Sequence, residues 1–407
     1  MSAPGRSAPS RARDDRLARL VGSGLIDSFG LALGWTVFNL HGLALHGLPA
    51  VGWCNAAMLI GVALSAPVAG RVAARADGRG LLRGTAVAEA VLRVATFAAM
   101  VAGAPLPLIA AGVVVLYVVS WTGYAGMRAE VAAVDSRAAA MTWYAVSILS
   151  IEAVGTAAAA VLPAGADGTL PPALLWGAAV VYAGSLVPQY LVGRDARVSR
   201  APRTARQGTP RARRALLAGG AGVMLLGSGP TLLVVGLAAE LHGRASVAAA
   251  GAAFTAGALV APAVAAQVER RAVRPAVSWP LLGAGMVLGW IVAPWHVAGL
   301  VVAQFLSGGA MSAFEGIMDT RMSAGGGATA DLAWSAAARA GGSAAAVGAA
   351  PALIASTGVV TLSGSAGILL LGALLLAVAP APLRPRLRCR PAGRSRSRAR
   401  TAGGTAA

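Results

Sequence analysis

Apolar residues follow one another along this chain in long blocks that short polar segments separate. A membrane-spanning helix needs about 20 mostly apolar residues in succession, and twelve blocks come close to that length. The first six blocks cover residues 17–43, 49–70, 81–103, 105–127, 138–162 and 172–193. The second six cover residues 215–241, 246–268, 276–293, 297–318, 332–356 and 358–380. We therefore predict an all-α membrane protein with about twelve transmembrane helices, the last two separated only by a turn within 356–365.

Three polar segments frame these blocks, and all three are rich in arginine. We expect residues 1–16 to be a disordered basic leader and residues 381–407 a disordered basic tail. The third segment, 194–214, carries eight arginines and divides a unit at 17–193 from a unit at 215–380. Alone it resembles an arm that binds nucleic acid, but it has no aromatic residue on which a base could stack. We interpret it as a cytoplasmic linker between two six-helix bundles.

The composition agrees with a membrane protein, since 12% of the residues are charged and 57% are hydrophobic, against about 25% charged in soluble proteins. The formal net charge is +19, and the sequence contains no lysine. Connections between spans that lie on the cytoplasmic side are enriched in basic residues. Counting alternate connections assigns 31 of the 34 arginines to one side. We therefore expect both termini in the cytoplasm, a multi-pass protein of the cell membrane, contact with the lipid bilayer and no nucleic-acid partner.

The two halves also repeat one another. The ten residues 70–79 that follow the second block align with 265–274 after the eighth block, at an offset of 195. Trp143 and Trp334 open the fifth and eleventh blocks at a nearly equal offset of 191. Many transporters are built from duplicated units of this kind, so we predict two related bundles of six helices.

These features resemble the major facilitator superfamily over residues 17–380. The loop signature of that family, between its second and third helices, matches Gly70, Arg75 and Arg79, whereas Ala74 replaces its acid and Asp77 its second glycine. The resemblance implies a fold of twelve helices, alternating access, and loops that act as conformational gates. The gating residues it implies are Gly70, Arg75, Asp77, Arg79, Arg128, Glu269, Arg270, Arg274, Asp319 and Arg321.

Helix 1 of this chain, with Asp27 in the stretch 24–30, also looks like the exporters of the family. The Gly-Pro motif that drug exporters carry in helix 5 is missing, because Thr156 follows Gly155.

Three charged residues stand inside predicted spans: Asp27 near mid-membrane, Glu152 toward the outer half and Arg339 nearer the cytoplasmic side. An ionised group at the centre of a span costs about 2.5–3.5 kcal/mol on insertion scales. Asp27 and Glu152 are candidates for carrying a proton or a cation in a central cavity. Arg339 is a candidate for binding an anionic group or for neutralising a carboxylate. Each of the three also admits a purely structural interpretation, as a hydrogen-bonded or ion-paired link between helices.

Other polar residues in the spans suggest supporting roles. Glu89 and Arg93 are four residues apart, hence on one helix face, and we interpret them as a structural ion pair. Trp35, Asn39 and Gln304 are candidate contacts of a bound substrate, with packing or helix-to-helix hydrogen bonds as the alternative.

Several chemistries are absent from the sequence. No phosphate-binding loop of the Gly-x-x-x-x-Gly-Lys type exists without lysine. The four histidines lack the spacing of a zinc protease, and the sequence contains no soluble domain. We therefore expect neither an enzyme nor a bound cofactor or metal.

The sequence favours a secondary active transporter that works as a monomer and moves a small organic compound by alternating access, exporting it as an antiporter with protons. The alternative is a transport-inactive relative that acts as a membrane sensor or an assembly partner.

Overall fold

The computed structural model describes residues 8–73, 75–134, 138–198, 211–323 and 328–379. Every regular element in these ranges is a helix. Helices α1 to η1 form what we call the first set: α1 (Ala8–His46), α2 (Leu48–Ala73), α3 (Gly78–Val101), α4 (Leu106–Val134), α5 (Ala138–Ala160), α6 (Pro172–Gly184), α7 (Val187–Val192) and η1 (Gly193–Asp195). The second set follows: α8 (Arg211–Gly227), α9 (Gly229–Leu232), α10 (Val234–His242), α11 (Ser246–Arg270), α12 (Pro275–Val287), η2 (Leu288–Ile291), α13 (Val297–Ser323) and α14 (Ala328–Val378).

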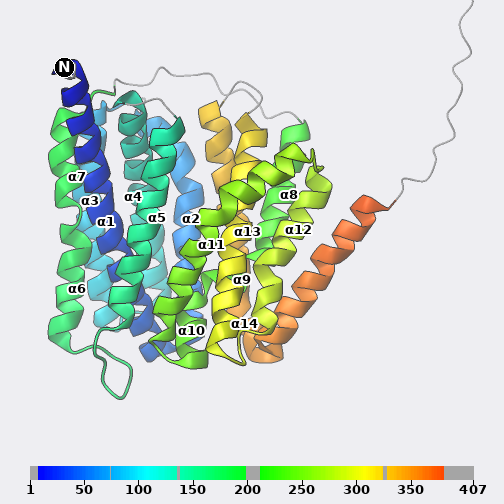
Figure 1. The fold of residues 1–407 in the computed structure, drawn as a ribbon. Coiled ribbons are helices and arrows are strands. Elements are labelled where there is room, and N and C mark those ends of the chain that lie inside the picture. Colours follow the sequence, from blue (N-terminus) through cyan, green and yellow to red (C-terminus); the bar gives the residue numbers. More distant parts are fainter. Residues whose placement is uncertain (1–7, 74, 135–137, 199–210, 324–327, 380–407) are drawn as a thin grey trace, which may run out of the picture.

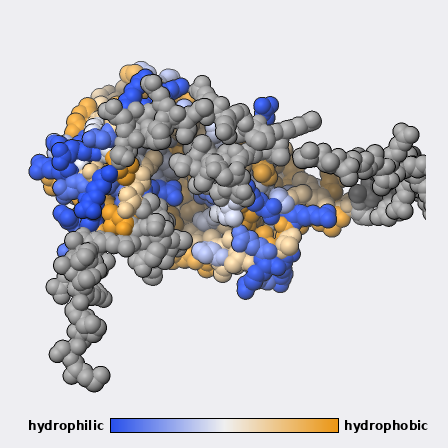
Figure 2. Space-filling model, turned by 90° about the horizontal axis from the view of Figure 1, so that it is seen from above, coloured by the Kyte–Doolittle hydropathy of each residue, from blue (hydrophilic) through white to orange (hydrophobic). Residues whose placement is uncertain are grey.

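Eight helical stretches in the described residues are long and apolar enough to cross a membrane, and three shorter apolar helices accompany them. Their outer surfaces carry large apolar side chains, such as Val180 and Leu376, which are 70% and 81% exposed, and Trp295, in the turn between η2 and α13, is 77% exposed. Such surfaces fit a lipid environment, and the protein is a multi-pass membrane protein. Figure 2 looks onto the end at which α1 begins, and hydrophilic residues gather on the parts of that end that are in view.

The longest helix, α14, contains a sharp break at Gly358. This glycine has φ 80° and ψ 157°, a conformation that residues with a Cβ rarely adopt. The break falls inside 356–365, where the sequence predicts a turn. In Figure 1 the chain reverses there, and its last helical segment leans away from the bundle.

The polar segments differ in part from expectation. Residues 8–16, predicted to be part of a disordered leader, belong to α1 instead, which begins at Ala8, and Arg16 is 5% exposed; residues 1–7 lie outside the described residues. Arg16 is buried because its guanidinium finds a carboxylate partner on α4, as described below. Residues 199–210 of the linker and the tail 381–407 lie outside the described residues.

The same helix pairings occur in both sets. In the first set α2 and α3 both pack on α4, and α1 packs on α5. In the second set α11 and α12 both pack on α13, and α8 packs on α14. Between the sets, α2 lies against α14 and α5 lies against α11.

The crossing of α11 and α13 is built from glycines. A Cβ atom on Gly257 of α11 would lie 2.0 Å from the carbonyl oxygen of Phe305 on α13. A Cβ on Gly308 of α13 would lie 2.0 Å from the carbonyl oxygen of Phe254 on α11. Helices in lipid associate through such small residues, which let the backbones approach. The two glycines therefore fix α11 and α13 in direct backbone contact.

We predict that Gly308→Ala lowers stability by about 1–3 kcal/mol, the usual cost of overpacking, because the new methyl group has to push α11 away. The measurement is the melting temperature of the purified protein in detergent. Gly316→Ala is the matched control on the same helix, since its Cβ would meet no atom within 4 Å. Equal melting temperatures for the two variants would contradict the close contact.

Candidate functional site

A buried charged cluster joins three helices of the first set. Arg93 of α3 is fully buried, and its Nη2 lies 2.5 Å from Oε1 of Glu89 and 2.9 Å from Oδ1 of Asp27 on α1. Its Nη1 donates to the carbonyl oxygen of Tyr182 at 2.6 Å and to Oγ of Ser185 at 3.1 Å, both at the end of α6. One guanidinium thus serves two carboxylates and holds α1, α3 and α6 together.

The cluster differs in one respect from the ion pair that the sequence suggests. Glu89 and Arg93 do lie on one face of α3, but Asp27 joins them from α1. The side chain of Glu89 is 2% exposed and that of Asp27 is 21% exposed. Asp27 is therefore the accessible end of the cluster. Its partner is Arg93, a pairing that the sequence alone does not reveal.

Glu152 of α5 forms no ion pair with this cluster, although Asp27 is close enough to act on it electrostatically. Its carboxylate accepts a hydrogen bond from the hydroxyl of Ser28 on α1. No ion pair of Glu152 occurs among the residues that the structure describes.

The second set contains a corresponding cluster around Arg339 of α14. Its Nη1 lies 2.5 Å from Oδ1 of Asp319 and its Nε 3.6 Å from Oε1 of Glu315, both on α13. Nη1 also donates to Oγ of Ser335 at 2.8 Å, and this hydroxyl donates to Asp319. Arg339 is 8% exposed, and again one arginine is shared by two carboxylates.

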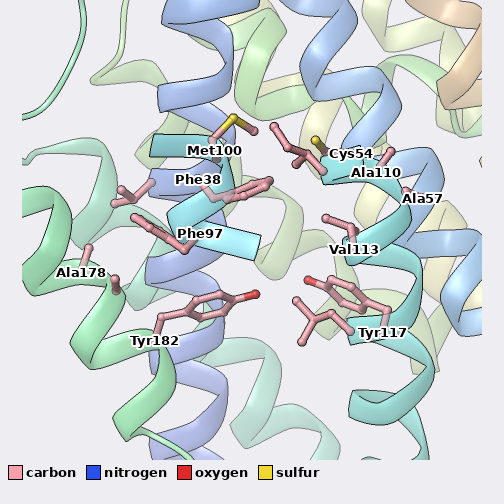
Figure 3. Packing of buried hydrophobic residues seen from close by; sticks show 14 of the residues in the cluster. Phe38, Cys54, Ala57, Phe97, Met100, Ala110, Val113, Tyr117, Ala178 and Tyr182 are labelled. Carbon is pink, nitrogen blue, oxygen red and sulfur yellow. The ribbon is translucent and has the colours of Figure 1, made fainter. Parts of the chain in front are cut away.

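The aromatic core beside the first cluster holds Trp35. This ring stacks on Phe38 and meets Tyr117 edge to face, with centroids 5.2 Å apart in both pairs. In Figure 3 the hydroxyl groups of Tyr117 and Tyr182 point toward one another across this core.

The two neutral candidates differ in their surroundings. The Asn39 amide donates to the carbonyl oxygen of Trp35 and accepts from Asn55 of α2 at 3.2 Å. Gln304 is fully buried on α13, and neither polar atom of its side chain has a hydrogen-bond partner among the described residues. An unsatisfied amide costs about 1–3 kcal/mol, so Gln304 is a strained position that a ligand or a second conformation would relieve.

Hydrogen bonds at the first residues of α3 fix the loop between α2 and α3. Asp77 stands at the N-cap of α3, where its side chain accepts from the backbone N–H of Gly80 at 2.8 Å. Arg79 donates to the carbonyl oxygen of Arg194 at 2.8 Å, just before the linker. Gly70 and Arg75 are exposed.

The other candidate gating residues lie at the same end of the bundle. The guanidinium of Arg128 lies 5.8 Å from the centroid of the Tyr124 ring. In the second set Arg321 donates to the carbonyl oxygen of Val273 at 3.2 Å, and Arg270 donates to Gln267 within α11. Glu269 and Arg274 are exposed. Each of these contacts stays within one set.

Glu130 of α4 is a buried anchor that the sequence reasoning overlooked. It is fully buried, pairs with Arg16 at 2.8 Å, and accepts from the backbone N–H groups of Arg197 and Val198. A glutamate near the end of a predicted span looks like an ordinary interfacial charge. The one feature of the sequence that could have indicated its role is the small number of acidic residues on this arginine-rich side. Glu130 ties the start of the linker to α1 and α4.

The fold has known counterparts among solved structures. The nucleoside transporter NupG matches with a TM-score of 0.69 at 11% identity, over 90% of this chain and 100% of that chain. A bacterial homologue of the iron transporter ferroportin, in an inward-facing state, matches with a TM-score of 0.63 at 16% identity, over 92% and 100%. The human organic anion transporter MFSD10 matches with a TM-score of 0.57 at 14% identity, over 89% and 99%. No protein-family model matches the chain, and no curated protein does.

These matches and the helix arrangement place the chain in the class of polytopic α-helical membrane proteins whose solved counterparts are transporters rather than enzymes. More narrowly, the chain shares the fold of these solved transporters over 89–92% of its length, in agreement with the fold that the sequence resemblance implies.

We predict that Arg93→Met destabilises the protein by about 3–5 kcal/mol, the usual cost of removing one partner of a buried ion pair. The loss would appear as a strongly lowered melting temperature or yield of folded protein in detergent. Adding Glu89→Gln to the Met variant removes the more deeply buried of the two stranded carboxylates and should restore part of the stability. Arg71→Met, at an exposed arginine of α2, is the control; a loss as large as for Arg93 would argue against the cluster.

Proposed function

We propose that the protein is a secondary active transporter that exports a small organic compound across the cell membrane by alternating access, as a monomer and in exchange for protons. The observation that carries this proposal is the group of carboxylates inside an apolar bundle with the fold of known transporters. Ionisable groups inside a membrane are costly and are kept where ions or substrates move. We assign proton transfer to Asp27 and Glu152, and the part of a counter-charge to Arg339.

The proposal includes twelve spans with both termini in the cytoplasm. Eight long apolar stretches, three shorter ones, and the division of the last stretch at Gly358 support this number. The arginine distribution supports the orientation.

We further propose that residues 17–193 and 215–380 are two repeats that rock against one another, with 194–214 as their tether. The matched pairings of α2 with α4 and of α11 with α13 support this division. The solved counterparts are described as nucleoside, iron and organic anion transporters; so varied a set supports transport as the general activity and leaves the substrate to the residues of this chain.

The contacts between the sets support a state that is closed on the outer side. Arg244, between α10 and α11, donates to the carbonyl oxygens of Ala159 at the end of α5 and of Gly168, both at 3.3 Å. Partial burial lowers the pKa of Arg244 from its usual value. On the proposed topology Arg244 lies outside, so these hydrogen bonds would hold the outer ends of the two repeats together.

Transport itself is tested in liposomes that contain the purified protein, with a panel of neutral, anionic and cationic compounds. We expect at least one compound to accumulate inside the liposomes when a pH gradient is imposed. Its uptake should stop when the gradient is collapsed. Asp27→Asn should abolish the coupling to the gradient. Absence of flux for the whole panel would favour the alternative of a transport-inactive sensor or assembly partner.

The outer closure is tested with Arg244→Ala, which removes both hydrogen bonds to the first set. A cysteine is introduced at Thr156, where α5 meets Gly251 of α11, in a background without native cysteines. We expect a membrane-impermeant maleimide to label this cysteine several-fold faster in the Arg244→Ala background. Glu240→Ala, at an exposed neighbour on α10, is the control, and unchanged labelling with Arg244→Ala would refute the role of Arg244.

A further inference from the structure

A cavity of about 180 Å³ lies in the second set, between the two segments into which Gly358 divides α14. Residues of α8, α9 and α12 complete its walls. Every residue that lines it is apolar except Ser363, on the second segment of α14. The cavity is separate from the two charged clusters.

The packing of α14 explains why this space is open. Four alanines between 345 and 350 of its first segment line the cavity, and their side chains are too short to fill it. The second segment packs on the bundle further along. A Cβ on Gly283 of α12 would lie 2.9 Å from the side chain of Leu370, and a Cβ on Gly367 would lie 2.5 Å from that of Leu288. These contacts leave the two segments of α14 apart near the reversal, where Figure 1 shows them diverging.

The open side of the cavity faces away from the first set. A Cβ on Gly52 of α2 would lie 3.1 Å from the carbonyl oxygen of Val347 and 2.5 Å from the Pro351 ring, so this face of α14 meets α2. Ala345 and Ala349 are each two residues from Val347, hence about 160° around the helix from it. Both alanines are exposed, and they open the cavity toward the lipid-facing surface of the bundle.

The depth of the cavity corresponds to one leaflet of the membrane. On the proposed topology Gly358 lies at the outer end. Leu353 and Ser363 are five residues from it on either side, hence about 8 Å deeper at 1.5 Å per residue, and Ala345 is about 20 Å deeper. The polar interface of a bilayer takes up about 5–7 Å on each side of a hydrocarbon core of about 30 Å. The cavity therefore runs from the inner edge of this interface to the middle of the membrane.

The one polar group of the cavity stands at its outer end. Ser363 is fully buried, and its hydroxyl has no hydrogen-bond partner in the part of the chain that the structure describes. A buried donor without an acceptor is costly, and the membrane core has no water to satisfy it. The depth of Ser363 is that at which the ester carbonyls of a phospholipid meet the hydrocarbon of its chains. A polar outer end and apolar deeper walls match the polarity of such a chain.

We infer that this cavity binds one acyl chain of an outer-leaflet phospholipid, whose ester carbonyl accepts a hydrogen bond from Ser363. An apolar protein cavity of about 150 Å³ stays dry and takes up apolar guests, and this cavity is of similar size and opens directly to lipid. The bound chain fills the space between the two segments of α14 and joins the last segment to the bundle. The site uses the orientation of the proposed topology, and it does not depend on transport being the activity.

The test uses the full-length protein in liposomes with a trace of phosphatidylcholine that carries a diazirine on one acyl chain. Illumination and mass spectrometry of peptides then locate the attached lipid. We expect residues 345–366 to be labelled at least fivefold more than α6, whose Val180 is 70% exposed, because a held chain stays in place while surrounding lipids exchange. A diazirine next to the ester should label the region of Leu353 and Ser363, and one at the chain end the region of Ala345.

Ala349→Phe fills the cavity from an exposed position, and we expect it to lower the labelling of 345–366 at least fivefold. Ala373→Phe makes the same change at an exposed residue of α14 that does not line the cavity, and it should alter the labelling by less than twofold. Ser363→Ala removes only the hydroxyl and should lower the labelling two- to fivefold. The melting temperature of each variant shows that it is folded.

Equal labelling of α6 and of 345–366, or full labelling of the Ala349→Phe variant, would overturn the lipid site. Loss of the label on addition of a transported compound would also overturn it, because the cavity would then hold substrate. A change from dimer to monomer in Ala349→Phe, with the labelling kept, would assign this face to a second copy of the chain instead. Absence of flux in the transport assay with the label intact would refute the proposed function and leave the lipid site standing.

Discussion

The absence of water inside a membrane is the constraint on which this structure depends, and the arginine of each buried cluster is its clearest expression. An ionised group placed among apolar helices has to find its partner inside the protein. Arg93 gathers Asp27, Glu89 and the end of α6, and Arg339 gathers Glu315, Asp319 and Ser335. These contacts orient the polar faces of the helices toward one another.

The same constraint explains why both clusters are asymmetric. Two carboxylates around one guanidinium fix the arginine firmly. In the first set they leave Asp27 accessible, with a side chain 21% exposed, and in the second set they leave both acids accessible, Asp319 at 35% and Glu315 at 40%. A fully neutral cluster would hold the helices as well and would attract nothing. The accessible carboxylates beside each arginine link the structural role of these arginines to the proton transfer that we propose for the interior.

Much of the fold could be predicted from the sequence because span length and charge asymmetry are local properties. The blocks of apolar residues anticipate the helices, and the weak separation at 356–365 anticipates the break at Gly358. Ion pairs across helices could not be anticipated in this way. The i, i+4 spacing reveals Glu89 with Arg93, but Asp27 reaches them only through the crossing of α1 and α3, and the burial of Glu130 by Arg16 depends on an N-terminal helix longer than its apolar block. The contact of Glu152 with Ser28 could not be predicted from the sequence either, because it depends on how α5 packs against α1.

The glycine crossing of α11 and α13 has a mechanical consequence. Two backbones in direct contact cannot slide or rotate independently, so the pair behaves as one stiff body. Within this pair α11 packs on α5, the helix of Glu152, and α13 carries Glu315 and Asp319. A displacement of α11 against α5 would therefore carry α13 and its carboxylates with it.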